Sequence, residues 1–509
     1  MTHINISVAT AARLKLRAER WVIQTLSDRL TFEVPGARHM PLFKNKMWDG
    51  KICLIDQRTN TVAAGLLPRI LAECRHRSWA VDIGDGVWLP NETVIGDEEF
   101  NRFLDDIQLP SKFREALQDK YAYQVDAVKK CIQFGRRLVL SPTGTGKSMI
   151  MYLAIRYHLW SRKIERALVV SVTTNLVRQL ASDFVDYGCD PDLIHTIFEG
   201  QDKSTDRPIV ITTWQSMLRQ NPVWARRFDM LLADEAHTYK SKVTGQLMES
   251  TTNAKVRLGF TGTLDGTETH LWVLEGTFGP VYRTTTTKKA IEAEVLAPLS
   301  VHINTLTYPE SDLTAYARRP KSQRTYDHEK NFIAGHAGRR RAICQYAHDL
   351  PATDNVLMLF KSKTKAAAMY FDVLQDMADG KRDIYYVTGD MDAEDREVVR
   401  QQLEQMQGAV VVATYKVFAT GINVKRLHHL IPVEGIKSVI TLLQSIGRIL
   451  RRDGSHAHVH DMVDDLRCGV DRRPNFAYAH AIERLNIYDA QGFPYDHRHL
   501  AINPSEEKA

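Results

Sequence analysis

The chain has 509 residues, of which 44% are hydrophobic and 25% are charged, a composition typical of soluble globular proteins. At usual domain sizes this length predicts about three domains. No apolar run reaches the ~20 residues of a membrane span, and the first residues lack the charged and apolar regions of a secretory signal. The six cysteines are far apart and form no CxxC pair, which argues against a zinc site or a disulfide framework and predicts a reducing cytoplasm.

The net charge of +6 is unevenly distributed along the chain. Residues 1–80 contain thirteen Lys and Arg against six Asp and Glu, a local excess of +7, so the remainder sums to −1 (+6 minus +7). A basic segment joined to a near-neutral remainder is typical of proteins that bind nucleic-acid phosphates. A solvated basic surface without a partner has the same signature, so charge alone leaves both interpretations open.

Residues 1–90 are predicted to form a small basic α+β domain that recognises DNA. The segment 12–30 is partly amphipathic with helical spacing, and 66–79 is a second helix candidate. Between them, 43–56 is predicted to be two short strands around an Asp-Gly turn, a strong hairpin signal. The acidic stretch 91–111 is predicted to be a linker with a short helix.

From residue 112 onward, apolar strand candidates alternate with helical stretches, which is typical of buried parallel sheets. The alternation predicts an α/β fold with two tandem lobes, 112–283 and 351–509, the second with a carboxy-terminal extension. The span 284–350 is irregular and partly basic, and is predicted to be an inter-lobe connector or a DNA-contacting insertion. The strand candidates are 137–141, 167–172, 209–214, 229–234 and 257–263, then 355–360, 384–389, 409–414 and 428–433.

The first strand of the first lobe leads into SPTGTGKS (141–148) and then into a helical stretch. This strand–loop–helix order is the context in which a P-loop cradles nucleotide phosphates with its backbone N–H groups. Lys147 is predicted to reach the β- and γ-phosphates, and Ser148 to coordinate Mg²⁺. The loop residues predicted to bind ATP are Thr143, Gly144, Thr145, Gly146, Lys147 and Ser148.

DEAH (234–237) is predicted to complete the ATP site. Asp234 follows a buried strand, where its carboxylate can hold Mg²⁺. Glu235 is placed to polarise the attacking water as a general base. An acidic pair after a strand can also be a simple helix cap, but the P-loop upstream favours the catalytic interpretation. His237 is expected to sense the γ-phosphate or to link to the neighbouring lobe.

QSIGRILRR (444–452) places arginines in the second lobe. Arg448 and Arg451 are three residues apart, so a helix would present both on one face. An arginine finger on such a face is worth ~10³–10⁵ in hydrolysis rate. Gln444 is assigned to the same catalytic group, because a plain basic surface helix explains neither it nor Gly447.

Two Thr-Gly strings are predicted to couple the nucleotide to a nucleic-acid track, namely TGT (261–263) and ATGIN (419–423). Within the second string, Gly421 is predicted to lie at the nucleotide and Thr420 near a phosphate backbone. Backbone contacts of this kind carry no sequence information.

In their order, YAYQ (121–124), SPTGTGKS, DEAH, TGT, ATGIN and QSIGRILRR resemble the motif set of superfamily-two helicases over roughly residues 112–470. The amino-terminal NKMWDGKICLID (45–56) is similar to the substrate-recognition domain of the UvsW-type recombination helicases of T4-like phages. The resemblance implies RecA-like lobes, ATP and Mg²⁺ as cofactors, and adenine recognition by Gln124, with Tyr123 near the base. Two departures are Ser141, where the strict P-loop has Gly, and Tyr121, where related motors carry Arg.

The resemblance further implies ATP-dependent remodelling of branched DNA: fork regression, Holliday-junction branch migration and R-loop unwinding in recombination, repair and replication. Branched or junction DNA and RNA–DNA hybrids are the expected partners, in the host cytoplasm and without a membrane. We expect a monomer, although the sequence does not determine the oligomeric state. The alternatives are a duplex translocase that leaves strands paired, an RNA helicase, and a non-catalytic protein with a degenerate ATPase fold. The intact Lys147, Asp234, Glu235 and Arg451 argue against the last.

Overall fold

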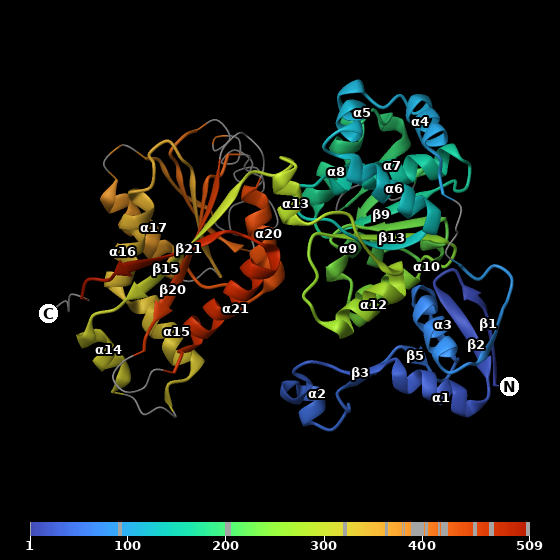
Figure 1. The fold of residues 1–509 in the computed structure, drawn as a ribbon, viewed down its shortest axis with the longest axis horizontal. Coiled ribbons are helices and arrows are strands. Elements are labelled where there is room, and N and C mark those ends of the chain that lie inside the picture. Colours follow the sequence, from blue (N-terminus) through green and yellow to red (C-terminus); the bar gives the residue numbers. More distant parts are fainter. Residues whose placement is uncertain are drawn as a thin grey trace. The chain divides into compact units, whose positions relative to one another are not determined.

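The computed structural model describes residues 2–89, 94–198, 205–318, 323–361, 365–378, 380, 382–387, 402, 406–415, 418, 426–450, 456–467 and 473–504. The chain divides into two compact units, one of Met1–Pro142 with Gly146–Thr285 and one of Thr143–Thr145 with Thr286–Ala509. The first unit holds an amino-terminal domain and a first α/β lobe, and the second holds a second α/β lobe (Figure 1).

The amino-terminal domain is built on a sheet of order β5-β6-β2-β1-β7, in which β1 and β2 are antiparallel and β7 joins β1 in parallel. Inward and outward side chains alternate along the strands, so Ile4, Ile6, Leu14 and Leu16 are buried against the two longer helices. Its elements are β1 (His3–Thr10), β2 (Arg13–Ala18), α1 (Arg20–Arg29), β3 (Thr31–Glu33), η1 (Ala37–His39), α2 (Pro41–Lys44), β4 (Lys51–Cys53), β5 (Ile55–Asp56), β6 (Thr61–Ala63), η2 (Ala64–Leu66), α3 (Leu67–His76) and β7 (Ala80–Ile83).

Two local predictions in this domain need correction. Only the second half of 12–30 is helical, because its first half alternates buried and exposed residues as strand β2. The hairpin predicted within 43–56 is wrong, since β4 pairs with β3 rather than with the residues before the turn, which include the end of α2. Gly50 does adopt a left-handed φ of 80°, but its turn joins a helix to a strand.

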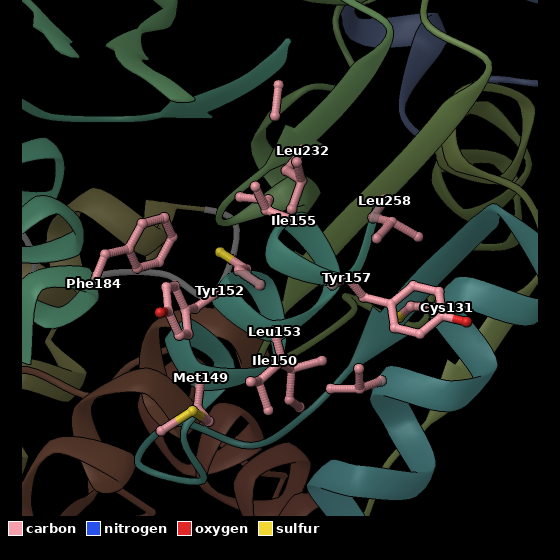
Figure 2. Packing of buried hydrophobic residues seen from close by; sticks show 14 of the residues in the cluster. Cys131, Met149, Ile150, Tyr152, Leu153, Ile155, Tyr157, Phe184, Leu232 and Leu258 are labelled. Carbon is pink, nitrogen blue, oxygen red and sulfur yellow. The ribbon is translucent and has the colours of Figure 1, made fainter. Parts of the chain in front are cut away.

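Lobe one is a parallel sheet of seven strands among the described residues, in the order β10-β11-β9-β12-β13-β8-β14, with helices on its faces. Helix α7 lies at the centre of one core, where Tyr152, Leu153 and Ile155 contact residues from α8 and the sheet (Figure 2). The elements are α4 (Asp97–Asp106), α5 (Ser111–Gln118), α6 (Ala122–Phe134), β8 (Arg136–Leu140), α7 (Lys147–Trp160), β9 (Ala167–Ser171), α8 (Thr174–Asp186), η3 (Pro191–Leu193), β10 (Ile194–Ile197), β11 (Ile209–Thr213), α9 (Trp214–Leu218), α10 (Pro222–Ala225), β12 (Met230–Ala233), η4 (Ala236–Thr238), α11 (Lys242–Glu249), β13 (Val256–Thr261), α12 (Glu268–Phe278) and β14 (Val281–Arg283).

Lobe two repeats this architecture, with a parallel sheet of order β17-β18-β16-β19-β20-β15-β21 in the part of the chain that is described. The two sheets and the domain before them confirm the predicted α/β fold class. The elements are α13 (Thr287–Glu292), β15 (Leu299–Thr307), α14 (Glu310–Ala317), α15 (Tyr326–Gly335), α16 (Ala337–His348), β16 (Val356–Phe360), α17 (Lys365–Met377), β17 (Ile384–Val387), β18 (Val410–Thr414), β19 (His429–Pro432), α20 (Val439–Ile449), β20 (Ala457–Asp465), α21 (Phe476–Gln491) and β21 (Tyr495–Ala501).

Two stretches predicted as linkers contain packed elements. Within 91–111, α4 buries Phe100, Phe103 and Leu104 in the core of lobe one. Within 284–350, β15 lies between β20 and β21 in the second sheet. Among the described residues, no helix is long and apolar enough to cross a membrane.

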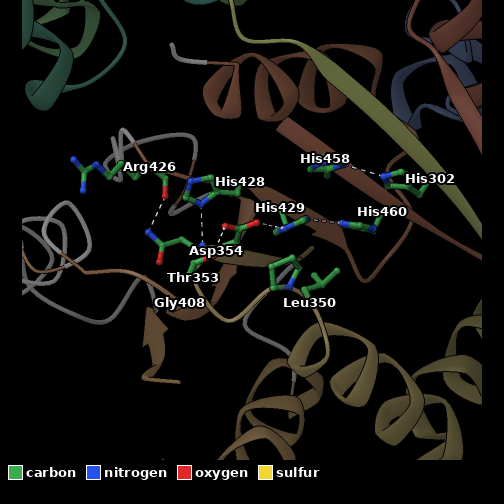
Figure 3. Close-up of polar contacts among 12 residues, drawn as sticks. His302, Leu350, Thr353, Asp354, Gly408, Arg426, His428, His429, His458 and His460 are labelled. Carbon is green, nitrogen blue, oxygen red and sulfur yellow. Dashed lines mark hydrogen bonds and ion pairs between the residues drawn. The ribbon is translucent and has the colours of Figure 1, made fainter. Parts of the chain in front are cut away.

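A row of histidines runs across the second sheet, on β15, β19 and β20 (Figure 3). The rings bond in pairs, with His302 3.0 Å from His458 and His429 2.9 Å from His460. Burial, followed by the other histidines, lowers the pKa of His458 to about 4. The outer nitrogens of His302 and His429 bond to Asp496 and Asp354 at 3.0 and 3.1 Å.

Candidate active site

The loop after β8 has the backbone shape that phosphate binding requires. Gly144 and Gly146 both adopt left-handed φ values, 85° and 78°, and α7 begins at the next residue. Lys147 donates from Nζ to the carbonyl oxygen of Ser141 at 3.3 Å, so its ammonium group lies back over the loop. The open N–H groups at the start of α7 favour an anion at this place.

The carboxylates after β12 sit beside this loop. Asp234 is 7% exposed and accepts a 3.0 Å hydrogen bond from the backbone N–H of Glu235. Burial, followed by the adjacent Glu235 carboxylate, raises the pKa of Asp234 to about 7, while the Lys147 ammonium lowers it. The site therefore holds a carboxyl group that readily loses its proton when a cation arrives.

Glu235 and His237 are held in a tight turn. Glu235 has a left-handed φ of 48°, rare for a residue with a side chain, and such strain clusters at functional sites. His237 Nδ1 lies 3.3 Å from Glu235 Oε2 and 2.9 Å from Thr261 Oγ1. Thr261 Oγ1 in turn donates to the carbonyl oxygen of Thr263 at 3.0 Å. The DEAH and TGT strings are thus joined by hydrogen bonds within lobe one.

Two further side chains approach the loop. The Gln124 amide, 4% exposed, packs so close to Gly146 that a Cβ there would lie 2.3 Å from Gln124 Nε2. The Ser148 hydroxyl is 2.8 Å from the Tyr187 hydroxyl. Sequence reasoning missed Tyr187, because nothing in the sequence brings a residue 39 positions later to the phosphate loop.

In lobe two, Gln444 and Arg448 lie one turn apart on α20, so they share a helix face. The Arg448 guanidinium lies 5.3 Å from the centre of the Phe418 ring, a cation–π distance. Arg451, Gly421 and Thr420 lie outside the described residues.

The amino-terminal domain is fastened to lobe one. Arg69 pairs with Glu275 at 2.6 Å and lies 4.7 Å above the ring of Trp272 on α12. Arg13 pairs with Glu249 at 2.9 Å. At these contacts the domain and lobe one meet through buried or half-buried groups, consistent with one compact unit.

A basic arm, residues 36–53, projects from this domain and carries α2 (Figure 1). Met47 at its end is 75% exposed and Leu42 54% exposed. The Trp48 indole donates to the carbonyl oxygen of Lys51 at 2.7 Å, which fixes the ring within the arm. A hollow on the arm is lined by Arg38, Phe43, Lys44, Lys46, Met47, Trp48 and Asp49. Cations and an ordered aromatic ring together form a surface suited to nucleic acid.

Comparisons with known proteins cover each part of the chain. Family models match at residues 3–84 (DNA helicase UvsW, N-terminal), 118–266 (type III restriction enzyme, res subunit) and 339–453 (helicase conserved C-terminal domain). The ATP-dependent DNA helicase uvsW of Enterobacteria phage T4 is 30% identical over 502 residues, 95% of this chain and 97% of that protein.

Solved structures are also similar. The crystal structure of T4 UvsW is 27% identical, with 98% of this chain and 99% of that chain covered and a TM-score of 0.48. A fragment of a putative HsdR subunit of a type I restriction enzyme from Vibrio vulnificus YJ016 is 19% identical, with 80% and 74% covered and a TM-score of 0.55. The second likeness shows the shared fold alone.

A phosphate loop and a DEAH turn on one parallel-sheet lobe, followed by a helicase carboxy-terminal lobe, define a superfamily-two helicase. Such an enzyme hydrolyses ATP and acts on nucleic acid. Identity over nearly all of both chains goes further: this chain belongs to the UvsW family of ATP-dependent DNA helicases.

Proposed function

We propose that this helicase uses ATP hydrolysis to remodel branched DNA, by fork regression, Holliday-junction branch migration and R-loop unwinding. The observation that carries the proposal is the basic arm on a domain anchored to lobe one through Arg69 and Glu275. A motor that only tracks along one DNA strand needs no DNA contacts beyond those on its two lobes. An added cationic surface fixed to one lobe suits a second DNA segment, such as a junction arm.

The energetics favour a branch-migrating motor. Opening duplex DNA costs ~1.4 kcal/mol per stacked step, but re-pairing the strands returns nearly all of it. A motor that moves a branch therefore works against a small net load, provided that both the parting and the pairing arms stay aligned. Lobe one, with the fixed arm, supplies a place to hold one of them.

For hydrolysis we propose roles that follow from the contacts at the loop. Lys147 and the N–H groups at the start of α7 bind the phosphates of ATP, and Gln124 reads the adenine. The Ser148 hydroxyl and the Asp234 carboxylate would hold Mg²⁺, which neutralises phosphate charge when bound. Oxygen ligands of this kind fit a hard divalent cation.

Glu235 is then the base that takes a proton from the attacking water. Its neighbour His237 passes the state of the site to Thr261 through their 2.9 Å contact. Gln444 and Arg448, with Arg451 and Gly421, are proposed to act from the second lobe, so that hydrolysis depends on lobe closure.

The test is the ATPase rate with no nucleic acid, single-stranded DNA, plain duplex, a four-way junction and an RNA–DNA hybrid. We expect the junction to stimulate most, and removal of the arm's charge by changing Arg38, Lys44 and Lys46 to Ala to lower the junction's advantage without changing the unstimulated rate. Equal stimulation by plain duplex, without strand displacement, would instead identify a duplex translocase. Stimulation by RNA alone would identify an RNA helicase.

A further inference from the structure

A pocket lies at the carboxyl edge of the second sheet, and none of the residues assigned to ATP lines it. Its floor is formed where the parallel strands β16, β19 and β20 end, and its walls come from α15, α17 and α21. Helices α15 and α21 lie side by side there (Figure 1). The space inside it that the centre of a water molecule can reach is about 70 Å³, and the larger open space of about 700 Å³ includes solvent at the mouth. Open parallel sheets bind ligands at this edge.

Two of the charged groups at this pocket are fully engaged by neighbours. The Arg339 guanidinium donates to both carboxylate oxygens of Asp464, at 2.6 and 2.9 Å. The Glu329 carboxylate accepts three hydrogen bonds, at 2.6 to 3.0 Å, from the residues that begin α21. These groups hold the walls together and leave little bonding capacity for a ligand.

Arg484 is different. It is 2% exposed, and its Nε and Nη2 donate to Asp461 at 2.7 Å each. Its Nη1 is itself buried, lies beside Gly435 of the pocket lining and has no hydrogen-bond partner among the described residues. Burying a charged donor without an acceptor is costly. A ligand that places an acceptor atom beside Nη1 would therefore be stabilised there.

Gly435 leaves space directly beside this donor. A Cβ at that position would lie 2.9 Å from Arg484 Nη1 and 3.5 Å from its Cζ. Any side chain there would cover the guanidinium or push it away from Asp461. Gly435 follows β19, and its φ is not left-handed, so the backbone does not require a glycine at this position. What distinguishes the glycine is the absence of a side chain beside Arg484.

The remaining lining tells what kind of molecule fits. The inner wall is apolar, formed by Ile333, Phe360, Val433 and Met462 among others. The mouth carries the exposed Lys330 and Lys361, and Tyr326, which is 41% exposed and accepts from Lys361 Nζ at 3.4 Å. It also carries the Glu434 carboxylate, which accepts from the Lys361 N–H at 2.7 Å, so the two lysines exceed it by one positive charge. A ligand that matches has a flat apolar body, one acceptor at its inner end and negative charge at its outer end.

We propose that this pocket binds one nucleotide unit. A nucleobase enters with a carbonyl oxygen or ring nitrogen facing Arg484, and its phosphate lies against Lys330 and Lys361. With the proposed function, the source of the nucleotide is the DNA strand that the helicase tracks, and this source is the part that rests on that proposal. A base held in lobe two, beside the aromatic ring of Tyr326, would fix the strand's position on that lobe during each cycle of hydrolysis.

The experiment measures binding of the full-length protein, without ATP, to an oligothymidylate and to a strand of equal length with abasic sugars. Free thymidine monophosphate is added as a competitor. A third probe, an oligothymidylate with one 5-iododeoxyuridine, is photo-cross-linked and its attachment mapped by mass spectrometry. The variants are Gly435→Ala, which fills the space beside Arg484, and Tyr326→Ala, which removes the partly exposed ring at the mouth. Lys288→Ala, on α13 outside the pocket lining, is the matched control for the loss of surface groups.

We expect wild type and Lys288→Ala to prefer the intact strand by on the order of tenfold, and to cross-link within the segments that line the pocket, 323–361, 366–370, 433–435, 462–464 or 473–504. Gly435→Ala and Tyr326→Ala should lose most of that preference. Competition by the free monophosphate supports the same site with a free nucleotide as its ligand. Equal binding of intact and abasic strands by wild type, or cross-links only elsewhere, overturns the inference. The ATPase panel tests the proposed function independently of this pocket. If DNA stimulates hydrolysis but binding shows no preference for intact bases, the proposed function stands and only the pocket inference fails.

Discussion

Asp234→Asn should make the nucleotide-free protein more stable while abolishing its hydrolysis of ATP. The reason is that the wild-type carboxyl group is buried beside Glu235, which raises its pKa from the ordinary 3.8 to about 7. Asn keeps the shape of the side chain and can still accept the 3.0 Å hydrogen bond from the N–H of Glu235. It removes only the charge that burial penalises.

The sign of the effect follows from proton binding. Below pH 3.8 the carboxyl is protonated in both folded and unfolded chains, so it costs nothing. As the pH rises, the unfolded chain releases the proton first, and stability falls until the folded pKa near 7 is passed. A shift of this size corresponds to about 4 kcal/mol at pH 7.5 and about 2 kcal/mol at pH 5, both as upper limits. Asp234→Asn should recover most of this lost free energy of unfolding.

The assay unfolds the full-length protein with denaturant at pH 5 and pH 7.5, without Mg²⁺ or ATP. Unfolding of lobe one is monitored through amide hydrogen exchange in β12 (Met230–Ala233). Asp265→Asn is the matched control, because Asp265 lies 2.6 Å from both Lys240 Nζ and His270 Nδ1, and the Lys240 pairing holds its pKa well below the usual range. That variant should be less stable than wild type at pH 7.5. If Asp234→Asn unfolds with wild type at both pH values, the carboxyl is not strained and our account of the site is wrong.

Three other outcomes follow from particular contacts. Tyr187→Phe frees the Ser148 hydroxyl from its 2.8 Å partner. The Mg²⁺ concentration needed for half-maximal ATPase should then fall by about twofold to fivefold. If the Mg²⁺ titrations of variant and wild type superimpose, the Tyr187 contact does not affect Mg²⁺ binding. Burial lowers the pKa of His158 to about 4, so stability is complete above about pH 6.5 and falls by about 2 kcal/mol on going from pH 7 to pH 5. His158→Leu should flatten that part of the unfolding profile, and an unchanged profile would mean that other groups cause the loss. Arg69→Ala removes the pairing with Glu275 and should loosen the amino-terminal domain by about 1 kcal/mol, seen as faster amide exchange in α3 and α12; unchanged exchange there would show that other contacts hold the domain.

The strands of both lobes that begin or end in unbroken apolar runs could be predicted from the sequence. β9 and β18 are five consecutive buried residues each, and runs as short and as rich in Val as these are typical of strands in the middle of a parallel sheet. The phosphate loop and DEAH turn were predictable for a related reason. Their chemistry needs a fixed local sequence directly after a strand. Finding the motif therefore predicts a strand before it, and an apolar strand candidate at that place supports the motif.

Two of the strands that escaped prediction carry polar residues into the core. β15 and β20 contain the buried His302, Asn304, His460 and Asp461, which mimic a surface pattern. Their burial is possible because the polar groups bond to one another across strands, as between His302 and His458. Such partners come from distant parts of the chain, so a single segment of sequence contains no sign of them. The pairing of β4 with β3 was hidden in the same way, since the Asp-Gly turn gave a stronger local signal.

The same reasoning separates structural polar groups from functional ones. Arg339 and Asp464 are buried and bond to each other and to neighbouring groups, and the pKa of Arg339 is raised by the pairing with Asp464 although burial opposes it. Asp234 is buried in lobe one and pushed by its surroundings toward the neutral form. Arg484 keeps its charge through Asp461 but has a donor left over. Such imbalance is costly, and a bound cation or ligand relieves it by supplying the missing charge or acceptor. For Asp234 that supply is a cation brought with ATP, and by the same argument the spare donor of Arg484 calls for a second ligand.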